Sequence, residues 1–462
     1  MIKKWNNWLG HHPTLRRLQL IALLRSTGQG FAAVETSLYL KELGWSGTSI
    51  GALLVAAGLF RTLNTTFAAE WNALLGPKNY LLLHECLTAA AALLLVTSSG
   101  SIPLGIAVIA AGFGMGHSGS GGPAAPVERR WLGAFSRRSG SSLFGKHAML
   151  SYVGMGTGAL FASLTPLLKP WLPGEEAYRL LFAVPALCAI AGAALLLTIQ
   201  GGAKRRNTPT GEMLTREQAA SLKTVPHRSG RSSILLTGGI ILVAIFILLA
   251  GWKFDLPLLS ATMPVLLFLL LIAAAIVRVS GGSREELAGI MNILQSVAVT
   301  LTSTMSAYWF SVQFNAAAGE VGLIIALSYF LAGAMSLVLM QAAERFGPSR
   351  PVVYMQLAGA ACVLLMPWSP SFGTAAFLYA LCSMFNLGTR GSRYAVMNSQ
   401  PAGSKRSWSS RLASFVIRLG AILWPGAFGR MLDEGEHILP FCLAAAIQVF
   451  STSGWRCRIR TK

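Results

Sequence analysis

The sequence predicts an all-α polytopic membrane protein made of two pseudo-symmetric six-helix bundles, and three observations point to it. Of the 462 residues, 53% are hydrophobic and only 12% are charged. Apolar stretches of about 20 residues follow one another, each long enough to cross a hydrocarbon core of about 30 Å. One helix–loop–helix pattern also occurs twice, because Gly51 and Gly76 recur as Gly322 and Gly347 at one offset (322 − 51 = 271 and 347 − 76 = 271).

The apolar stretches predict helices rather than strands. Strands of a membrane barrel alternate polar and apolar residues, and these stretches do not. Backbone groups in lipid must find their hydrogen bonds within their own segment, as they do in a helix. Two similar halves in a membrane protein are typical of transporters that rock about a central site.

The N-terminal bundle is expected to occupy residues 1–201. The apolar windows and the polar breaks between them predict helices at 18–40, 48–69, 80–98, 103–125, 144–167 and 178–200. A polar and strongly basic loop follows at 202–233.

The C-terminal bundle is expected to occupy residues 284–462. The offset places its first helix near residue 287, because 16 + 271 = 287, and an apolar span does begin there. The predicted helices of this bundle are 287–311, 319–341, 351–370, 372–390, 408–431 and 438–453.

The segment 234–283 belongs to neither repeat and is strongly apolar. We expect two additional membrane helices, at 234–251 and 257–277, separated by a turn at Trp252–Pro257. The total is then 6 + 2 + 6 = 14 spans, and this even number keeps both bundles in the same orientation. The alternative is a re-entrant or surface hairpin.

The net charge of +21 follows the topology of a membrane protein. Lysine and arginine gather before the first span, in alternate connections, in the central loop and at the C-terminus. By the positive-inside rule both termini lie in the cytoplasm, and the protein is a multi-pass cell (inner or plasma) membrane protein. This pattern argues against a nucleic-acid partner. None of the six cysteines forms a CxxC pair, so we expect no disulfide framework, metal or cofactor.

Two short loops carry the most specific motif. Residues Glu344, Arg345, Gly347 and Arg350 follow the pattern G-x-x-x-D-R-x-G-R-R between two helices of the second bundle. The first copy is eroded, and of it only Gly76 and Lys78 remain. On these motifs and the two-bundle plan, the chain resembles the major facilitator superfamily (MFS). The resemblance implies that these six residues form gating loops; ordinary interfacial charge is the alternative.

The resemblance also implies where a substrate binds. Helices one, four, seven and ten of this family face a central cavity, and helices two and eleven meet between the bundles. Polar and charged residues at membrane depth on those helices are the substrate-binding candidates: Arg25, Gln29, Arg61, His117, Asn292, Gln295, Asn386 and Arg418.

The charge count within the spans suggests an anionic organic substrate. Three arginines, Arg25, Arg61 and Arg418, stand against one well-buried carboxylate, Glu35. Arginine remains charged and its planar fork suits a carboxylate or phosphate. The alternative is that Arg61 and Arg418 only bridge the two bundles.

Glu35 is the first candidate for proton coupling, and Glu85 with His84 is the second. A carboxyl group in a low-dielectric cavity is easier to protonate near neutral pH, so it can load and release a proton during a cycle. The alternative for each is a position at the wet end of its helix, where it stays ionised.

We therefore expect a secondary active transporter of a small organic solute, an antiporter or symporter working by alternating access as a monomer in the lipid bilayer, with protons as coupling ions. A drug or metabolite efflux protein that depends on apolar residues such as Phe31 and Phe60 is the first alternative. A non-transporting receptor or assembly protein of the same fold is the second. The GxGxxG match at Gly114–Gly119 is not a dinucleotide site, because no strand precedes it, and we expect no enzyme activity.

Overall fold

The computed structural model describes residues 12–98, 100–115, 124–133, 140–172, 174–199, 284–346, 349–393 and 408–459. Within these ranges every regular element is a helix. The polar loop at 202–233 and the two additional spans predicted at 234–251 and 257–277 lie outside the described residues.

The N-terminal bundle begins with the long helix α2, in which Pro13 occupies the first turn and needs no hydrogen-bond partner for its nitrogen. Its helices are α2 (Pro13–Glu42), α3 (Gly47–Thr66), α4 (Ala68–Thr97), α5 (Ser101–Ala111), α6 (Ala125–Gly133), α7 (Gly140–Ala162), α8 (Thr165–Leu168), α9 (Glu176–Leu181) and α10 (Ala183–Thr198).

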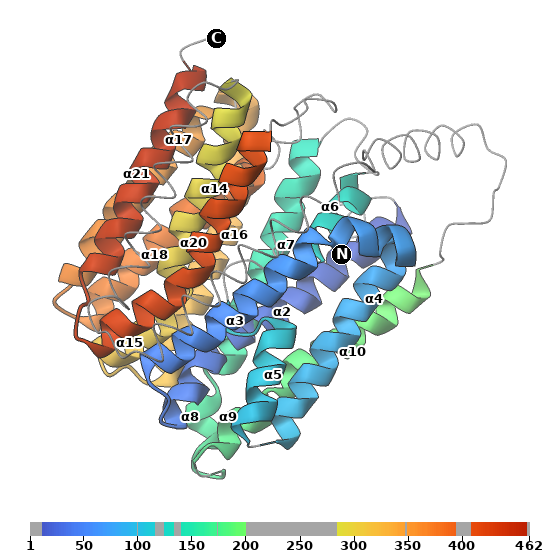
Figure 1. Ribbon diagram of the computed structural model, residues 1–462, viewed down its shortest axis with the longest axis vertical. Coiled ribbons are helices and arrows are strands. Elements are labelled where there is room, and N and C mark those ends of the chain that lie inside the picture. The colour runs from blue at the N-terminus through green and yellow to red at the C-terminus, as the bar shows by residue number, and fades with distance from the viewer. Residues whose placement is uncertain are drawn as a thin grey trace.

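The C-terminal bundle lies beside it and is coloured yellow to red in Figure 1. Its elements are α14 (Arg284–Ser303), α15 (Ser306–Gln313), α16 (Ala318–Phe346), α17 (Ser349–Leu365), the 3₁₀ segment η1 (Met366–Trp368), α18 (Phe372–Gly388), α20 (Trp408–Asp433) and α21 (Leu439–Ile459).

The helix bounds repeat at the offset that the sequence predicts. The first helix of each bundle begins at Pro13 and Arg284 (284 − 13 = 271), and the second at Gly47 and Ala318 (318 − 47 = 271). The helices α5 and α18 begin at Ser101 and Phe372 (372 − 101 = 271), and α7 and α20 end at Ala162 and Asp433 (433 − 162 = 271). These four pairs of helices therefore show that the two bundles are built on one plan.

Several predicted spans are interrupted. The expected helix 103–125 is wrong as one element, because α5 ends at Ala111 and left-handed backbone at Gly112 and Gly114 turns the chain before α6. The expected helix 287–311 breaks between α14 and α15, and 178–200 is divided into α9 and α10. Gly76, with φ of 77°, separates the part of α4 that continues α3 from the part that forms the third span.

Six helices in the described residues are long and apolar enough to cross a membrane: Glu70–Thr97, Leu143–Leu168, Glu176–Thr198, Ala318–Ala342, Arg350–Trp368 and Phe372–Arg393. Helix α2 is not among them. It buries Gln19 and Glu35 instead, so its polar side chains face protein rather than lipid.

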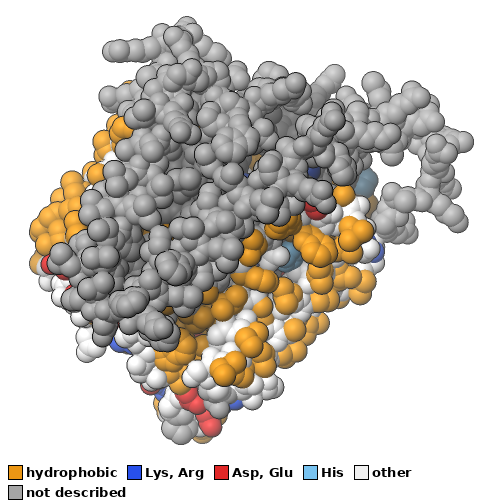
Figure 2. All heavy atoms as spheres, viewed as in Figure 1, with side chains coloured by type: hydrophobic (Ala, Val, Ile, Leu, Met, Phe, Trp, Pro, Cys, Tyr) orange, Lys and Arg blue, Asp and Glu red, His pale blue; other side chains and the backbone are white. Residues whose placement is uncertain are grey.

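Large apolar side chains cover the outside of the N-terminal bundle. Figure 2 shows hydrophobic side chains spread over the lower face of the view, where α4, α5 and α10 lie in Figure 1. Exposed residues on these helices include Leu83, Leu93, Ile102, Ile106, Leu187 and Ile190. A surface of this kind is suited to lipid chains rather than to water.

The two bundles meet along two seams, α3 with α20 and α7 with α16. In the first seam, a Cβ atom at Gly51 would overlap the backbone of Pro425, and one at Gly429 would overlap the carbonyl of Gly47. The second seam includes a stacked pair, Tyr152 and Tyr329, with centroids 6.5 Å apart. Small residues therefore bring the helices of the first seam into backbone contact, as in other membrane helix pairs.

Candidate functional site

A buried ionic cluster joins three helices of the N-terminal bundle. The guanidinium of Arg25 on α2 donates to Oε1 of Glu85 on α4 at 2.7 Å and to Oε2 of Glu128 on α6 at 2.7 Å. Only 9% of the Arg25 side chain is exposed, and the two carboxylates are almost fully buried. One cation and two anions thus meet where charged groups are costly unless they are paired.

This ionic cluster retains polar atoms that bond to nothing else in the described part of the chain. They are one terminal nitrogen of Arg25, Oε1 of Glu128 and both ring nitrogens of the buried His147 on α7. The charges of Glu128 and Arg25 act on His147, so the imidazole lies near the pair. The cluster therefore has capacity for further hydrogen bonds or for a proton.

The C-terminal bundle holds a neutral amide cluster in the corresponding place. Nε2 of Gln448 on α21 donates to the backbone carbonyl oxygen of Gln356 on α17 at 2.8 Å and also to the side chain of Asn386 on α18. Oε1 of Gln295 on α14 accepts from the hydroxyl of Ser451. Gly359 has no room for a Cβ because Asn386 lies against it.

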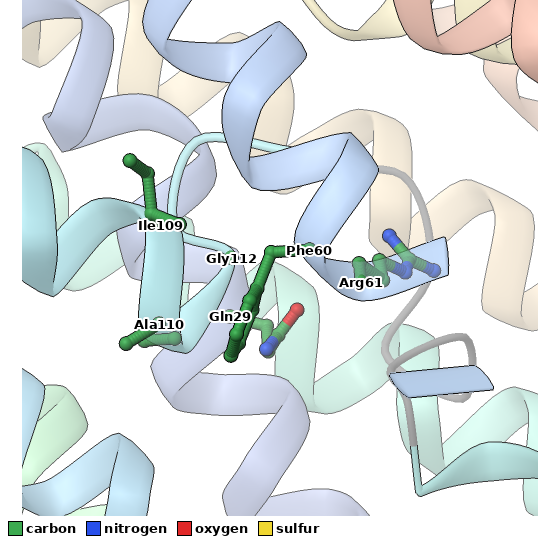
Figure 3. A pocket seen from close by; sticks show the side chains of 7 residues that line it. Gln29, Phe60, Arg61, Ile109, Ala110 and Gly112 are labelled. Carbon is green, nitrogen blue, oxygen red and sulfur yellow. The ribbon is translucent and has the colours of Figure 1, made fainter. Parts of the chain in front are cut away.

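Two of the predicted substrate residues line one recess beside the break after α5. Gln29 of α2, Phe60 and Arg61 of α3 and the end of α5 from Ile109 to Gly112 enclose it. Figure 3 shows Gln29 beside the ring of Phe60, with Arg61 one residue further along α3. The recess is lined by an amide, an aromatic ring, part of Arg61 and the carbonyl end of a helix, while the guanidinium of Arg61 extends away from Gln29 and Phe60 (Figure 3).

Glu35 is fully buried near the other end of α2. Its Oε1 accepts a hydrogen bond from the hydroxyl of Thr165 on α8 at 2.6 Å, and its Oε2 has no partner among the described residues. Lys169 and Tyr178 are the ionisable groups whose charges act with it. The alternative, a wet position at the end of the helix, is therefore wrong for Glu35.

Of the other coupling candidates, Glu85 belongs to the ionic cluster and His84 is the residue before it on α4. Glu85 is buried rather than solvated, which excludes a wet helix end for it. His84 is half-buried on the adjacent face of α4, where its ring meets that of Tyr80 edge-on at 4.8 Å. The substrate candidate Asn292 is buried on α14, away from solvent.

The predicted gating loops are described only in part. Gly76 forms the sharp turn, and Nζ of Lys78 donates to the carbonyls of Leu197 and Ile199 at the end of α10, within the same bundle. Arg345 and Arg350 are exposed. His117, Gly347 and the side chains of Glu344 and Arg418 lie outside the described residues.

One premise of the sequence-based charge count is wrong. The spans were expected to bury a single carboxylate against three arginines, whereas the described residues bury three carboxylates, Glu35, Glu85 and Glu128. Two of them neutralise Arg25 directly. Glu128 escaped notice because the sequence predicted a continuous helix at 103–125 and so placed Glu128 in the loop after it, whereas Glu128 lies on α6.

No motif in the sequence points to His147, Gln356 or Gln448. The repeat offset was a usable signal for Gln356, since 356 − 85 = 271 makes it the counterpart of Glu85. It likewise pairs His147 with Arg418, because 418 − 147 = 271. Among the described residues, no group of three His, Cys, Asp or Glu side chains is arranged to hold a metal ion.

Comparison with known proteins gives similar folds but no sequence family. No protein-family model and no curated protein matches the chain. A POT family transporter in complex with 5-aminolevulinic acid has a TM-score of 0.61 at 13% identity, over 98% of both chains. The xylose transporter of E. coli in an inward-open conformation has a TM-score of 0.61 at 12% identity, over 95% of both chains. The fucose:proton symporter of E. coli has a TM-score of 0.58 at 12% identity, over 96% of this chain and 97% of that one.

Proposed function

We infer that this chain, which has the major facilitator fold of these transporters, is a secondary active transporter that works by alternating access. The observation that carries the inference is the pair of seams between two bundles of one plan. Each bundle has its own buried polar cluster, while the α3–α20 seam has small residues where its helices touch. Such bundles can rock against each other as bodies, and a site between them is then open to one side at a time.

We place the first substrate contacts at the recess of Gln29, Phe60 and Arg61. Arg25 is held by Glu85 and Glu128, so it adds no net positive charge to the cavity. Arg61 lines the recess beside the interrupted helix α5, and a guanidinium suits a carboxylate or phosphate group. The carbonyl end of α5 suits a hydrogen-bond donor. An organic anion that also carries a hydroxyl or amino group satisfies both.

Phe60 supports a second candidate, the proton-coupled efflux of an amphiphilic drug or metabolite. Its ring lines the recess and is 36% exposed. Phe31, the other apolar residue expected in this role, is fully buried against Phe182 in the core. Only Phe60 of that pair is therefore available to an apolar substrate.

Glu35 is our proposed proton carrier for the cycle. Its carboxyl group is enclosed by α2 and α8, and one of its oxygens has no hydrogen-bond partner among the described side chains, so it can take up a proton without breaking the bond from Thr165. The neighbouring ionisable groups are Lys169, Tyr178 and, on α2 itself, Tyr39 and Glu42.

The test is flux into proteoliposomes with a panel of hydroxy acids, amino acids and lipophilic cations, with and without a pH gradient. We expect uptake of an anion that falls about tenfold or more in Arg61→Ala and is partly kept in Arg61→Lys. Arg130→Ala, at an exposed position on α6 that has no proposed role, is the control. Cation flux that depends on Phe60 but not on Arg61 supports efflux instead. Binding without flux for every compound supports a non-transporting receptor.

A further inference from the structure

We propose that Asp433 is a latch that closes one end of the transporter by capping helix α3 of the opposite bundle. This end, which we call the distal end, comprises Glu42–Thr48, Ser311–Ala318 and Asp433–Leu439. The proposal rests on the alternating-access function inferred above, and it names the contact that sets the balance between the two states of the cycle.

The carboxylate of Asp433, the last residue of α20, bonds to the first turn of α3. Its Oδ1 accepts from the backbone N–H of Gly47 at 2.9 Å, and its Oδ2 accepts from the N–H of Thr48 at 2.8 Å and from the Thr48 hydroxyl at 2.7 Å. The hydroxyl of Tyr308 on α15 adds a fourth donor at 3.3 Å. An anion at a helix N-terminus accepts hydrogen bonds from free N–H groups and interacts favourably with the positive end of the helix dipole.

The backbone geometry makes this cap possible. Gly47 and Gly429 approach so closely that a Cβ on Gly429 would overlap the Gly47 carbonyl. A second bridge between the bundles lies at the same end, where Nζ of Lys41 donates to the carbonyl of Ser311 at 2.8 Å. The distal end is thus closed by hydrogen bonds between the bundles as well as by apolar packing.

Among the described residues, the carboxylate cap is found on the α3–α20 seam and not on the α7–α16 seam. The repeat offset places Ala162 opposite Asp433 in the plan (433 − 162 = 271), and Ala318 and Gly319 opposite Gly47 and Thr48. At the distal end of the α7–α16 seam, Gly319 and Gly322 pack against Ser163 and its neighbours. A carboxylate cap therefore stabilises the distal end at the α3–α20 seam, while the equivalent place on the other seam has only a methyl group.

Opening the distal end must separate Asp433 from α3. Water then replaces the protein donors, so the open state lacks the stabilisation that the cap gives to the closed state. We expect removal of the carboxylate to raise the distal-open population several-fold while leaving each bundle intact, because the ionic and amide clusters lie elsewhere.

The test is a distance measurement by double electron–electron resonance (DEER) on the full-length protein in lipid nanodiscs, with the six native cysteines replaced by alanine. Spin labels at Trp171→Cys and Glu436→Cys, both exposed at the distal end of opposite bundles, report its opening. We expect one short distance in the parent and a several-fold larger long-distance population in Asp433→Ala. Thr48→Ala, which removes one of the donors, should give a smaller increase of the same kind.

Glu434→Gln is the matched control. Glu434 follows Asp433 but pairs with Arg430 of α20, within the same bundle, at 2.7 Å, so its loss should leave the distances unchanged. Unchanged distances in both Asp433→Ala and Thr48→Ala, or an equal shift in Glu434→Gln, would overturn the latch. Flux measured on the same preparations separates the two proposals: a shift in distance without flux supports the latch and rejects the transport function.

Discussion

The two bundles share one plan but fill its interior differently. Glu85 and Gln356 occupy equivalent positions, since 356 − 85 = 271. The Glu85 side chain forms an ion pair with Arg25. At Gln356 the backbone carbonyl accepts from the Gln448 amide, and the side-chain Oε1 accepts from the hydroxyl of Thr452 at 3.5 Å. The same place in the fold therefore supports an ionic cluster in one half and a neutral amide cluster in the other.

This difference shows which half can change its charge by taking up or releasing a proton. An amide cluster stays neutral at any physiological pH, so its role is limited to positioning helices. The ionic cluster has two carboxylates, one guanidinium and a neighbouring imidazole, and it can gain or lose a proton. The N-terminal bundle also holds Glu35, whose counterpart at offset 271 is Ser306, bonded to the hydroxyl of Tyr379. Charge-dependent steps are therefore expected in the N-terminal bundle.

Arg25→Ala should have the largest effect. It leaves Glu85 and Glu128 buried together without their cation, and breaking a buried pair in this way costs about 3–5 kcal/mol. We expect a large loss of thermal stability in detergent and no measurable flux. Arg25→Met combined with Glu85→Gln and Glu128→Gln removes all three charges and should recover most of the stability. A single Arg25→Ala variant as stable as the parent would show that the cluster is not under electrostatic constraint.

Gln356→Glu should come next, because it places a carboxylate in the neutral cluster. No arginine occupies the place of Arg25 there, since 25 + 271 = 296 is a serine. An unpaired buried charge costs a few kcal/mol or takes up a proton. We expect a lower midpoint of thermal unfolding at pH 8 than at pH 5, because the carboxyl group is neutral at the lower pH. Gln356→Met is the control for size and polarity, and its midpoint should not depend on pH in this way.

Glu35→Gln should leave stability nearly unchanged but alter coupling. The glutamine oxygen can still accept from Thr165, so the fold keeps its bond. We expect the substrate still to move down its own gradient. The stimulation of this flux by a pH gradient should fall about tenfold. Thr165→Val, which removes the hydrogen bond and keeps the carboxyl group, should retain the response. Equal pH responses in the parent and Glu35→Gln would assign coupling to another group, with Glu85 the next candidate.

Much of the fold follows from the sequence because lipid imposes simple rules. Hydropathy located most helices, and the two glycine landmarks gave the offset that the helix bounds repeat. The interruptions could not be predicted in the same way. The left-handed turn at Gly112 lies within an apolar stretch that hydropathy alone assigns to one helix.

The site was harder to predict because hydropathy locates a helix but does not show which way each of its side chains points. The sequence placed the ionisable groups Arg25, Glu35 and Glu85 within membrane spans, yet it could not show that Arg25 and Glu85 bond each other across 60 residues. Glu128 joins them only because the chain re-enters the bundle as α6 after the break. The offset does predict which residues share a position, and it shows Glu85 and Gln356 to be such a pair.

Glu85→Gln is the smallest and sharpest test of the comparison. It gives the N-terminal bundle the residue type that the C-terminal bundle already has, and it leaves Arg25 paired one-to-one with Glu128. Because the cluster starts with two anions and one cation, the change should alter the free energy of unfolding by less than about 1 kcal/mol. The reverse exchange, Gln356→Glu, lacks a cation and should cost several times more. If both exchanges cost the same, position in the fold rather than charge balance governs the two clusters. If Glu85→Gln is the more costly of the two, both carboxylates are needed to hold Arg25, and the N-terminal cluster acts as a fixed brace rather than as a group that exchanges protons.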